Sequence, residues 1–156
     1  WQSDQWTREN MNILAKAIQF AADKHSGQTD KGGNAYILHP LRMMMRLRTS
    51  DEELMAVAVL HDVVEDCGVS FDELRAFGMP ERVVAGVKAL TRQAGETYEQ
   101  FIERLAGNRD ALIVKKEDLR DNSDLTRLKG VTEKDVARMQ KYMRAFKRVE
   151  VLLDAA

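Results

Sequence analysis

The apolar residues of the chain recur at intervals of three and four, the spacing of helices that bury one face. The first such face has residues at i, i+4, i+7 and i+11, namely Leu14, Ile18, Ala21 and His25. We expect this helix to be capped near Thr7. Strand-type alternation does not extend beyond a few residues, so the pattern predicts an all-α domain of about seven or eight helices.

Capping and turn residues place the boundaries of the later elements. Ser70 with Glu73, and Thr97 with Gln100, have the spacing of a capping box. Pro40 suits the first turn of a helix, where no intrahelical amide hydrogen bond is lost. The expected elements are a loop over 27–35 and helices from about 40 to 47, 50 to 68, 70 to 78, 80 to 91, 97 to 105, 110 to 124 and 132 to 153.

Composition and charge narrow the class of protein. Of the 156 residues, 44% are hydrophobic, and 24 basic side chains balance 25 acidic ones, which argues against nucleic-acid binding by bulk electrostatics. The single cysteine excludes a disulfide framework and a cysteine-rich zinc site. No apolar run approaches the roughly 18 residues of a membrane span, and Trp1 to Trp6 do not resemble a signal peptide. We therefore expect a cytoplasmic protein without membrane or nucleic-acid partners, and the sequence does not indicate its oligomeric state.

The block HDVVED, residues 61–66, ends an otherwise apolar predicted helix. On a continuous helix of about 100° per residue, its four ionisable residues fall within an arc of about 140°: His61, Asp62, Glu65 and Asp66. Buried ionisable groups are costly unless they are paired or bind a metal ion. Imidazole with carboxylates suits manganese, iron or zinc better than magnesium. Because a lone His-Asp pair arises easily by chance, the block needs partners elsewhere in the chain.

Candidate partners lie on two other predicted helices. His39 stands at a helix start, where its ring can point into a cleft. Asp118 and Asn122 are four residues apart and therefore share a helix face. With the first two residues of the block, His39 and Asp118 would complete a set of two histidines and two aspartates from three helices. Such a set leaves open positions on a metal ion for water and substrate.

Other polar residues have plainer interpretations. His25 is interpreted as a hydrogen-bonded histidine packed beneath the site, a role compatible with orienting a ligand. Four basic residues recur every three or four positions on the last predicted helix, namely Arg138, Lys141, Arg144 and Arg148. This spacing is typical of a solvated face, and contact with an anionic substrate is the alternative.

Three segments of the chain resemble the hydrolase domain of the RelA/SpoT proteins, which belong to the HD-domain metal-dependent phosphohydrolases. They read AIQFAADKHSGQTDKGGNAYILHP, AVLHDVVEDCGVSFDEL and VKKEDLRDN. The resemblance is strongest over residues 14–128, and the stand-alone small alarmone hydrolases are the most similar in size. We interpret residues 1–156 as a single HD-type hydrolase domain, with no room for a synthetase domain.

The resemblance implies an all-α fold, one bound Mn²⁺ and removal of the 3′-pyrophosphate from guanosine tetra- and pentaphosphate. The metal ligands that it implies are His39, His61, Asp62 and Asp118. The pair implied to orient and deprotonate the attacking water is Glu65 and Asp66, and the sequence leaves open which of them is the base. The positions implied to bind substrate are Lys31, Lys115 and Asn122.

Three acidic residues depart from the family's pattern. Asp30 stands where the family usually has arginine, Asp121 replaces a histidine, and Asp124 replaces an arginine. Loss of the two arginine charges should weaken anion binding, because a charge-assisted partner is removed and repulsion is added. Asp121 is also an alternative to Asp118 as the metal ligand.

These departures keep other functions open. One alternative is a phosphohydrolase that acts on a different phosphorylated metabolite. Another is a nucleotide-binding or sensing module that keeps the HD-type scaffold without turnover, which the acidic residues favour and the retained ligand set opposes. A purely structural helical domain would require that the predicted ligands and the Glu65-Asp66 pair be unrelated.

Overall fold

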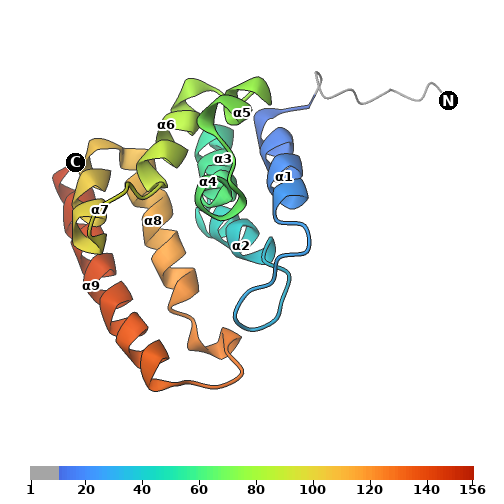
Figure 1. Ribbon diagram of the computed structural model, residues 1–156. Helices are drawn as coiled ribbons and strands as arrows, with labels where there is room; N and C mark the ends of the chain where they lie inside the picture. The colour runs from blue at the N-terminus through green and yellow to red at the C-terminus, as the bar shows by residue number, and fades with distance from the viewer. Residues whose placement is uncertain (1–10) are drawn as a thin grey trace.

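The computed structural model describes residues 11–156, and the regular secondary structure of this part of the chain consists of helices joined by loops (Figure 1). Its elements are α1 (Ile13–Lys24), α2 (Leu38–Arg46), α3 (Glu52–Leu60), α4 (Val63–Cys67), α5 (Phe71–Ala76), α6 (Glu81–Leu90), α7 (Tyr98–Arg104), the 3₁₀ helix η2 (Leu105–Gly107), α8 (Arg109–Asn122), the 3₁₀ helix η3 (Leu125–Arg127) and α9 (Glu133–Ala155). Between residues 11 and 156 the β-type pairing is limited to an isolated bridge of Thr29 with Ala35. The all-α prediction is confirmed.

Most helix starts follow the predicted caps, but α2 begins at Leu38, two residues before the predicted start at Pro40. The capping boxes at Ser70 and Thr97 both form, and a third forms at Thr132. The predicted cap at Thr7 lies outside the described residues. Within them, α1 begins at Ile13, and Asn12 accepts a hydrogen bond from the amide of Ala15 at 2.8 Å.

The helix predicted over residues 50–68 is broken next to its ionisable block. α3 ends at Leu60 and α4 begins at Val63, so counting the two as halves of one helix gives the eight helices of the prediction. The ring Nδ1 of His61 donates to the carbonyl of Ala58 at 2.8 Å. In an uninterrupted helix that carbonyl would accept from the amide of Asp62, so the side chain competes with the helix at this point.

The hydrophobic core is built around α3. Six of its nine residues are buried, and α1, α2, α6 and α8 pack around it. On α6, a side chain at Gly86 would place its Cβ 2.8 Å from the methyl groups of Val57, so glycine allows the two helices to approach closely. α9 lies along α8 at the edge of the molecule and buries Ala145 and Val149 (Figure 1). Because α3 is buried, the HDVVED block begins inside the protein, directly after the end of this helix.

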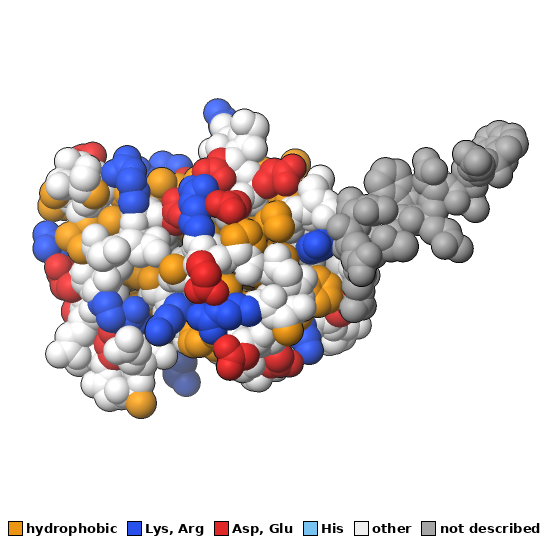
Figure 2. Space-filling view, turned by 90° about the horizontal axis from the view of Figure 1, so that it is seen from above, with side chains coloured by type: hydrophobic (Ala, Val, Ile, Leu, Met, Phe, Trp, Pro, Cys, Tyr) orange, Lys and Arg blue, Asp and Glu red, His pale blue; other side chains and the backbone are white. Residues whose placement is uncertain are grey.

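The surface of the described residues mixes both signs of charge. Viewed from above, basic and acidic side chains lie next to one another on the face drawn in Figure 2. Arg82, for example, pairs with Asp51 at 2.7 Å and with Asp110 at 2.8 Å. Within residues 11–156, none of the helices is long and apolar enough to cross a bilayer.

Candidate metal centre

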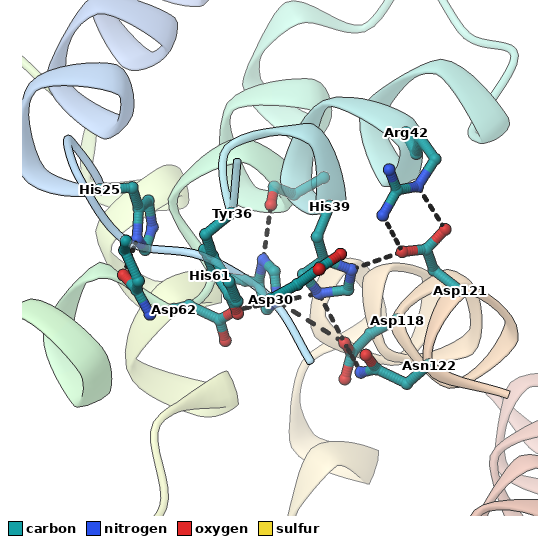
Figure 3. A network of polar contacts seen from close by, with 12 residues as sticks. His25, Asp30, Tyr36, His39, Arg42, His61, Asp62, Asp118, Asp121 and Asn122 are labelled. Atoms are coloured by element: carbon teal, nitrogen blue, oxygen red, sulfur yellow. Dashed lines mark hydrogen bonds and ion pairs between the residues drawn. The ribbon is translucent and has the colours of Figure 1, made fainter. Parts of the chain in front are cut away.

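The four predicted metal ligands converge from three parts of the fold (Figure 3). His39 lies in the first turn of α2, His61 and Asp62 lie at the α3–α4 junction, and Asp118 lies on α8. The Nε2 atom of His61 is 2.9 Å from Asp62 Oδ2, and the Nε2 atom of His39 is 3.2 Å from Asp118 Oδ1. His39, His61 and Asp62 each offer a ligand atom within 4.8 Å of the others. The structure therefore brings together residues that are up to 79 positions apart in the sequence.

Each imidazole is held through the ring nitrogen that faces away from this cluster. His61 Nδ1 donates to the carbonyl of Ala58 at 2.8 Å, and His39 Nδ1 donates to Asp121 Oδ2 at 2.7 Å. In the neutral form of each ring the lone pair therefore lies on Nε2, and both Nε2 atoms face carboxylate oxygens. His61 Nε2 is buried and has no hydrogen-bond partner among the described residues. Lone pairs that face anions in a buried site are unfavourable without a cation, so the donor set fits a divalent metal ion.

The two carboxylates of the cluster are held in the ionised form. Asp118 accepts from Lys115 Nζ and from Asn122 Nδ2, both at 2.7 Å. Burial alone would raise the pKa of Asp118, but the Lys115 ammonium and the two imidazoles hold it well below its usual range. Asp62 accepts the hydroxyl of Tyr36. Ionised oxygens are the form that binds a divalent ion.

Asp121 is fully buried and lies behind His39. Besides the His39 ring, it accepts from Arg42 at 2.8 and 3.0 Å and from Arg127 at 2.7 Å, and Arg46 lies 3.0 Å away. Burial opposes its ionisation, but the hydrogen bonds from His39 and Arg42 hold the pKa of Asp121 far below its ordinary value. Asp121 contacts Nδ1 of His39, the ring nitrogen that faces away from the cluster, whereas Asp118 lies next to Nε2.

The predicted acid–base pair lies on α4, and its two members face different surroundings. Glu65 accepts the amide of Arg92 and lines a cavity together with His61, Asp62 and Asp118. Both residues are exposed overall, and at Asp66 the partial burial of the carboxyl group together with the charge of Asp62 raises the pKa. The predicted arc assumed one continuous helix from residue 61 to 66. The helix is interrupted at the α3–α4 junction, but His61 and Asp62 keep right-handed helical backbone, and the amide of Asp66 donates to the carbonyl of Asp62 at 2.9 Å.

Two cavities flank the cluster. The loop-side cavity, of about 200 Å³, is lined by Lys31, Tyr36, His39, Asn122, Asp124, Arg127, Leu128, Arg138, Met139 and Tyr142, with residues 29, 30 and 32. The α7-side cavity, of about 220 Å³, is lined by His61, Asp62, Glu65, Leu90, Arg92, Tyr98, Phe101, Lys115, Asp118, Asn122, Lys141 and Tyr142. Asn122 and Tyr142 line both cavities, and Asn122 also donates to Asp118 of the cluster.

The basic face predicted on the last helix is only partly solvated. Arg138 lines the loop-side cavity and Lys141 lines the α7-side cavity, whereas Arg148 pairs on the surface with Glu103 at 2.5 Å. Arg138 and Lys141 are thus half-buried, whereas Arg144 and Arg148 are exposed, as expected of a solvated face. Spacing alone could not find this, because it does not show which side of α9 closes over the site.

The residues predicted to contact substrate lie at the cavity walls. Lys31 is exposed on the loop-side cavity. Lys115 and Asn122 line the α7-side cavity, and both donate to Asp118. Asp30 does not stand as a free acid, because its Oδ2 pairs with Arg127 at 3.0 Å. The expected repulsion from Asp30 is thus offset by an arginine from η3.

The sequence interpretation missed Tyr36, whose hydroxyl donates to Asp62. Its place three residues before His39, in the loop that leads into α2, was the available signal. The Tyr36 ring also packs against His25, with the ring centres 4.8 Å apart. His25 is buried and its Nδ1 contacts Gln28 Oε1 at 2.8 Å. This agrees with the packing role expected of His25 beneath the site.

An all-helical fold with paired histidines and aspartates at its centre defines an HD-type metal-binding protein. The family described as the HD domain matches residues 17–151, and the chain belongs to this family. The membership of the HD-domain family that the three segments predicted is confirmed. Membership implies binding of a divalent metal ion, in agreement with the cluster around His39, His61 and Asp62.

Relatives with assigned names match part of the chain. It is 32% identical over 120 residues to a guanosine-3′,5′-bis(diphosphate) 3′-pyrophosphohydrolase of Aquifex aeolicus, covering 70% of this chain and 17% of that protein. It is 39% identical over 83 residues to the pyrophosphohydrolase MESH1 of Danio rerio, covering 48% of this chain and 46% of that protein. The chain spans 13–17% of the length of the first three curated relatives that it matches.

A solved structure has the same fold. It belongs to a metazoan orthologue of SpoT that hydrolyses ppGpp, and it superposes with a TM-score of 0.74 over 93% of each chain. The sequence identity is 24%, so this likeness supports the fold alone.

Proposed function

We propose that the protein is a metal-dependent phosphohydrolase that removes the 3′-pyrophosphate of guanosine 3′,5′-bis(diphosphate). The observation that carries the proposal is the pair of buried imidazoles whose Nε2 atoms face the carboxylates of Asp62 and Asp118. The choice of substrate rests on the relatives from Aquifex aeolicus and Danio rerio. Both are named as 3′-pyrophosphohydrolases of this nucleotide.

The proposed metal ligands are His39, His61, Asp62 and Asp118, with Mn²⁺ favoured because imidazole and carboxylate are both good ligands for it. When bound, a divalent ion supplies a Lewis acid for the phosphoryl oxygen and lowers the pKa of water. Asp121 fixes the orientation of His39, and the Ala58 carbonyl fixes that of His61.

We assign the first proton transfer from the attacking water to Glu65, since its carboxylate lines the cavity that also exposes Asp62 and Asp118. Asp66 is the alternative base, because partial burial and the charge of Asp62 raise its pKa and make it a stronger proton acceptor. Substitution of each by its amide separates the two, because only the base loses turnover while metal content is kept.

The cations around the site suit a substrate with two phosphate chains. Arg92, Lys115 and Lys141 line the α7-side cavity, and Lys31 lines the loop-side cavity. We propose Lys31, Lys115 and Asn122 as substrate-binding residues, with Lys115 holding Asp118 at the same time. The single hydrolase domain over residues 1–156 and the cytoplasmic location stay predictions.

The test is elemental analysis of the purified protein, followed by release of pyrophosphate from guanosine 3′,5′-bis(diphosphate) with added Mn²⁺. We expect about one divalent ion per chain and release of guanosine diphosphate. Release from another nucleotide alone would replace the substrate but keep the reaction class. Tight nucleotide binding without any product would favour the sensing module instead.

A further inference from the structure

Asp124 lines the loop-side cavity and uses only one of its carboxylate oxygens. Oδ1 accepts from the amide of Thr126 at 3.0 Å and from its hydroxyl at 2.5 Å. Oδ2 makes no hydrogen bond or ion pair with any described residue. The hydrogen bonds from Thr126 lower the pKa of Asp124, so the free oxygen is that of a carboxylate.

The second acid of this cavity is already saturated. Asp30 Oδ1 accepts the amides of Gly32 and Asn34, both at 2.9 Å, and its Oδ2 pairs with Arg127. The loop is fixed tightly against η3, because a Cβ at Gly32 would lie 2.3 Å from the carbonyl of Arg127. Asp30 therefore has a structural contact, and Asp124 supplies the free acceptor.

The cations of the loop-side cavity are largely neutralised. Arg127 pairs with Asp30 and Asp121, and Arg138 pairs with Asp135. The α7-side cavity differs, because Arg92 and Lys141 form no ion pair with a described carboxylate. Phosphate groups are therefore better matched by the α7-side cavity together with Lys31, which leaves the rest of the loop-side cavity for an uncharged part of the nucleotide.

The walls of the loop-side cavity suit a flat, uncharged ring. Leu128 and Met139 supply apolar surface, and Tyr142 supplies an aromatic ring that also lines the α7-side cavity. A base seated there would present its polar edge to the side chains at the rim. An acid at that edge accepts N–H groups and repels ring nitrogens that carry a lone pair.

We propose that Asp124 is a specificity-determining residue that reads the base, its free Oδ2 accepting the N1–H and the exocyclic N2–H of guanine. The proposal rests on the nucleotide substrate of the proposed function. Guanine presents these two neighbouring donors, adenine presents an unprotonated N1 beside its amine, and hypoxanthine lacks the N2 amine. The acid that replaces a family arginine thus supplies base recognition in place of a charge contact with phosphate.

The test is calorimetric binding of GDP, inosine diphosphate and ADP to the Mn²⁺-loaded protein and to Asp124→Asn. The amide keeps an oxygen for Thr126 and replaces the free acceptor by a donor. We expect wild type to bind GDP about tenfold more tightly than inosine diphosphate, the value of one hydrogen bond to a charged group, and ADP more weakly still. In Asp124→Asn the ratio of the GDP to the inosine diphosphate affinity should fall to about one.

The ratio is used because removal of a negative charge strengthens binding of every diphosphate alike. Asp23→Asn, an exposed acid of α1 outside both cavities, removes the same charge and should keep the ratio. A wild-type ratio of one, an unchanged ratio in Asp124→Asn or no detectable binding of GDP would each overturn the proposal. Absence of pyrophosphate release with an intact GDP preference would overturn the proposed function alone.

Discussion

The metal centre and the loop side of the same site are built differently. At the centre, His39, His61 and Asp118 are each at most 8% exposed as side chains, and each is fixed by at least one short contact to a second polar group. On the loop side, Lys31 and Asp124 keep groups free of protein partners. The centre is organised to hold one ion in one geometry, and the loop side leaves groups available to a ligand.

This difference bears on the three acidic departures from the family pattern. The proposed ligands are retained, because a buried carboxylate or imidazole without its partners is costly. Asp30 and Asp124 lie on the loop side, where a new partner such as Arg127 can compensate, whereas Asp121 lies behind His39 and is compensated by buried contacts with Arg42 and Arg127. Specificity is therefore more easily changed on the loop side than at the centre.

The largest effect should come from Asp62→Ala at the centre. We expect loss of bound metal together with a fall in turnover of at least about a thousandfold, since a metal ion supplies several kcal/mol of transition-state stabilisation. Elemental analysis and pyrophosphate release measure the two quantities, with circular dichroism to show that the helices remain. Turnover that survives in this variant would remove Asp62 from the proposed ligand set.

Asp121→Ala tests whether the contact of Asp121 with His39 contributes to metal binding at the centre. The variant leaves the His39 Nδ1–H and three arginines without their shared acceptor. We expect a loss of about 3 kcal/mol in unfolding free energy, the low end for a buried pair because the arginines are partly solvated. Mn²⁺ affinity should fall by about 10–100-fold.

Chemical denaturation and Mn²⁺ titration measure these two changes for Asp121. Asp121→Asn is the matched control, because it keeps one acceptor for the His39 ring and should lose less on both scales. Equal metal affinity in wild type and Asp121→Ala would show that the orientation of His39 does not depend on Asp121.

Acid should weaken metal binding at the centre. Burial alone would lower the pKa of His61, but the charges of Asp62 and Asp118 raise it well above its ordinary value, and the pKa of His39 is raised by its contacts with Asp118 and Asp121. A metal ion must displace these protons. The affinity for the metal ion is therefore highest at pH values above the raised pKa values, and it decreases as the pH falls below them. We expect a loss of about tenfold per pH unit for each proton displaced.

Calorimetry in buffers of different ionisation enthalpy counts the protons released when Mn²⁺ binds. A Mn²⁺ affinity that does not change between about pH 8 and about pH 6 would contradict a role for these imidazoles as ligands.

Asp30→Asn, on the loop side, should have the smallest effect on stability and metal binding of the variants compared. The amide oxygen can still accept from the amides of Gly32 and Asn34, and only the ion pair with Arg127 is lost. We expect a loss of about 1 kcal/mol or less in unfolding free energy, with metal content unchanged. Thermal unfolding and elemental analysis measure both, and a loss of metal would show that the loop supports the centre directly.

The all-helical fold was predictable because helix formation depends on local pattern. The period of the apolar residues and the capping boxes at Ser70 and Thr97 act over a few residues. The break after Leu60 was not predictable, since it depends on the direction of the His61 ring.

The sequence by itself determined the kinds of group at the centre, because HDVVED and the histidine before Pro40 are short segments whose chemistry is read directly. Only the tertiary structure decided how these groups are paired. Asp30 meets Arg127 across 97 residues, and Asp121 meets His39 across 82. Such contacts depend on how whole helices pack, and local patterns in the sequence do not predict them. The free oxygen of Asp124 beside the saturated Asp30 is a consequence of that packing.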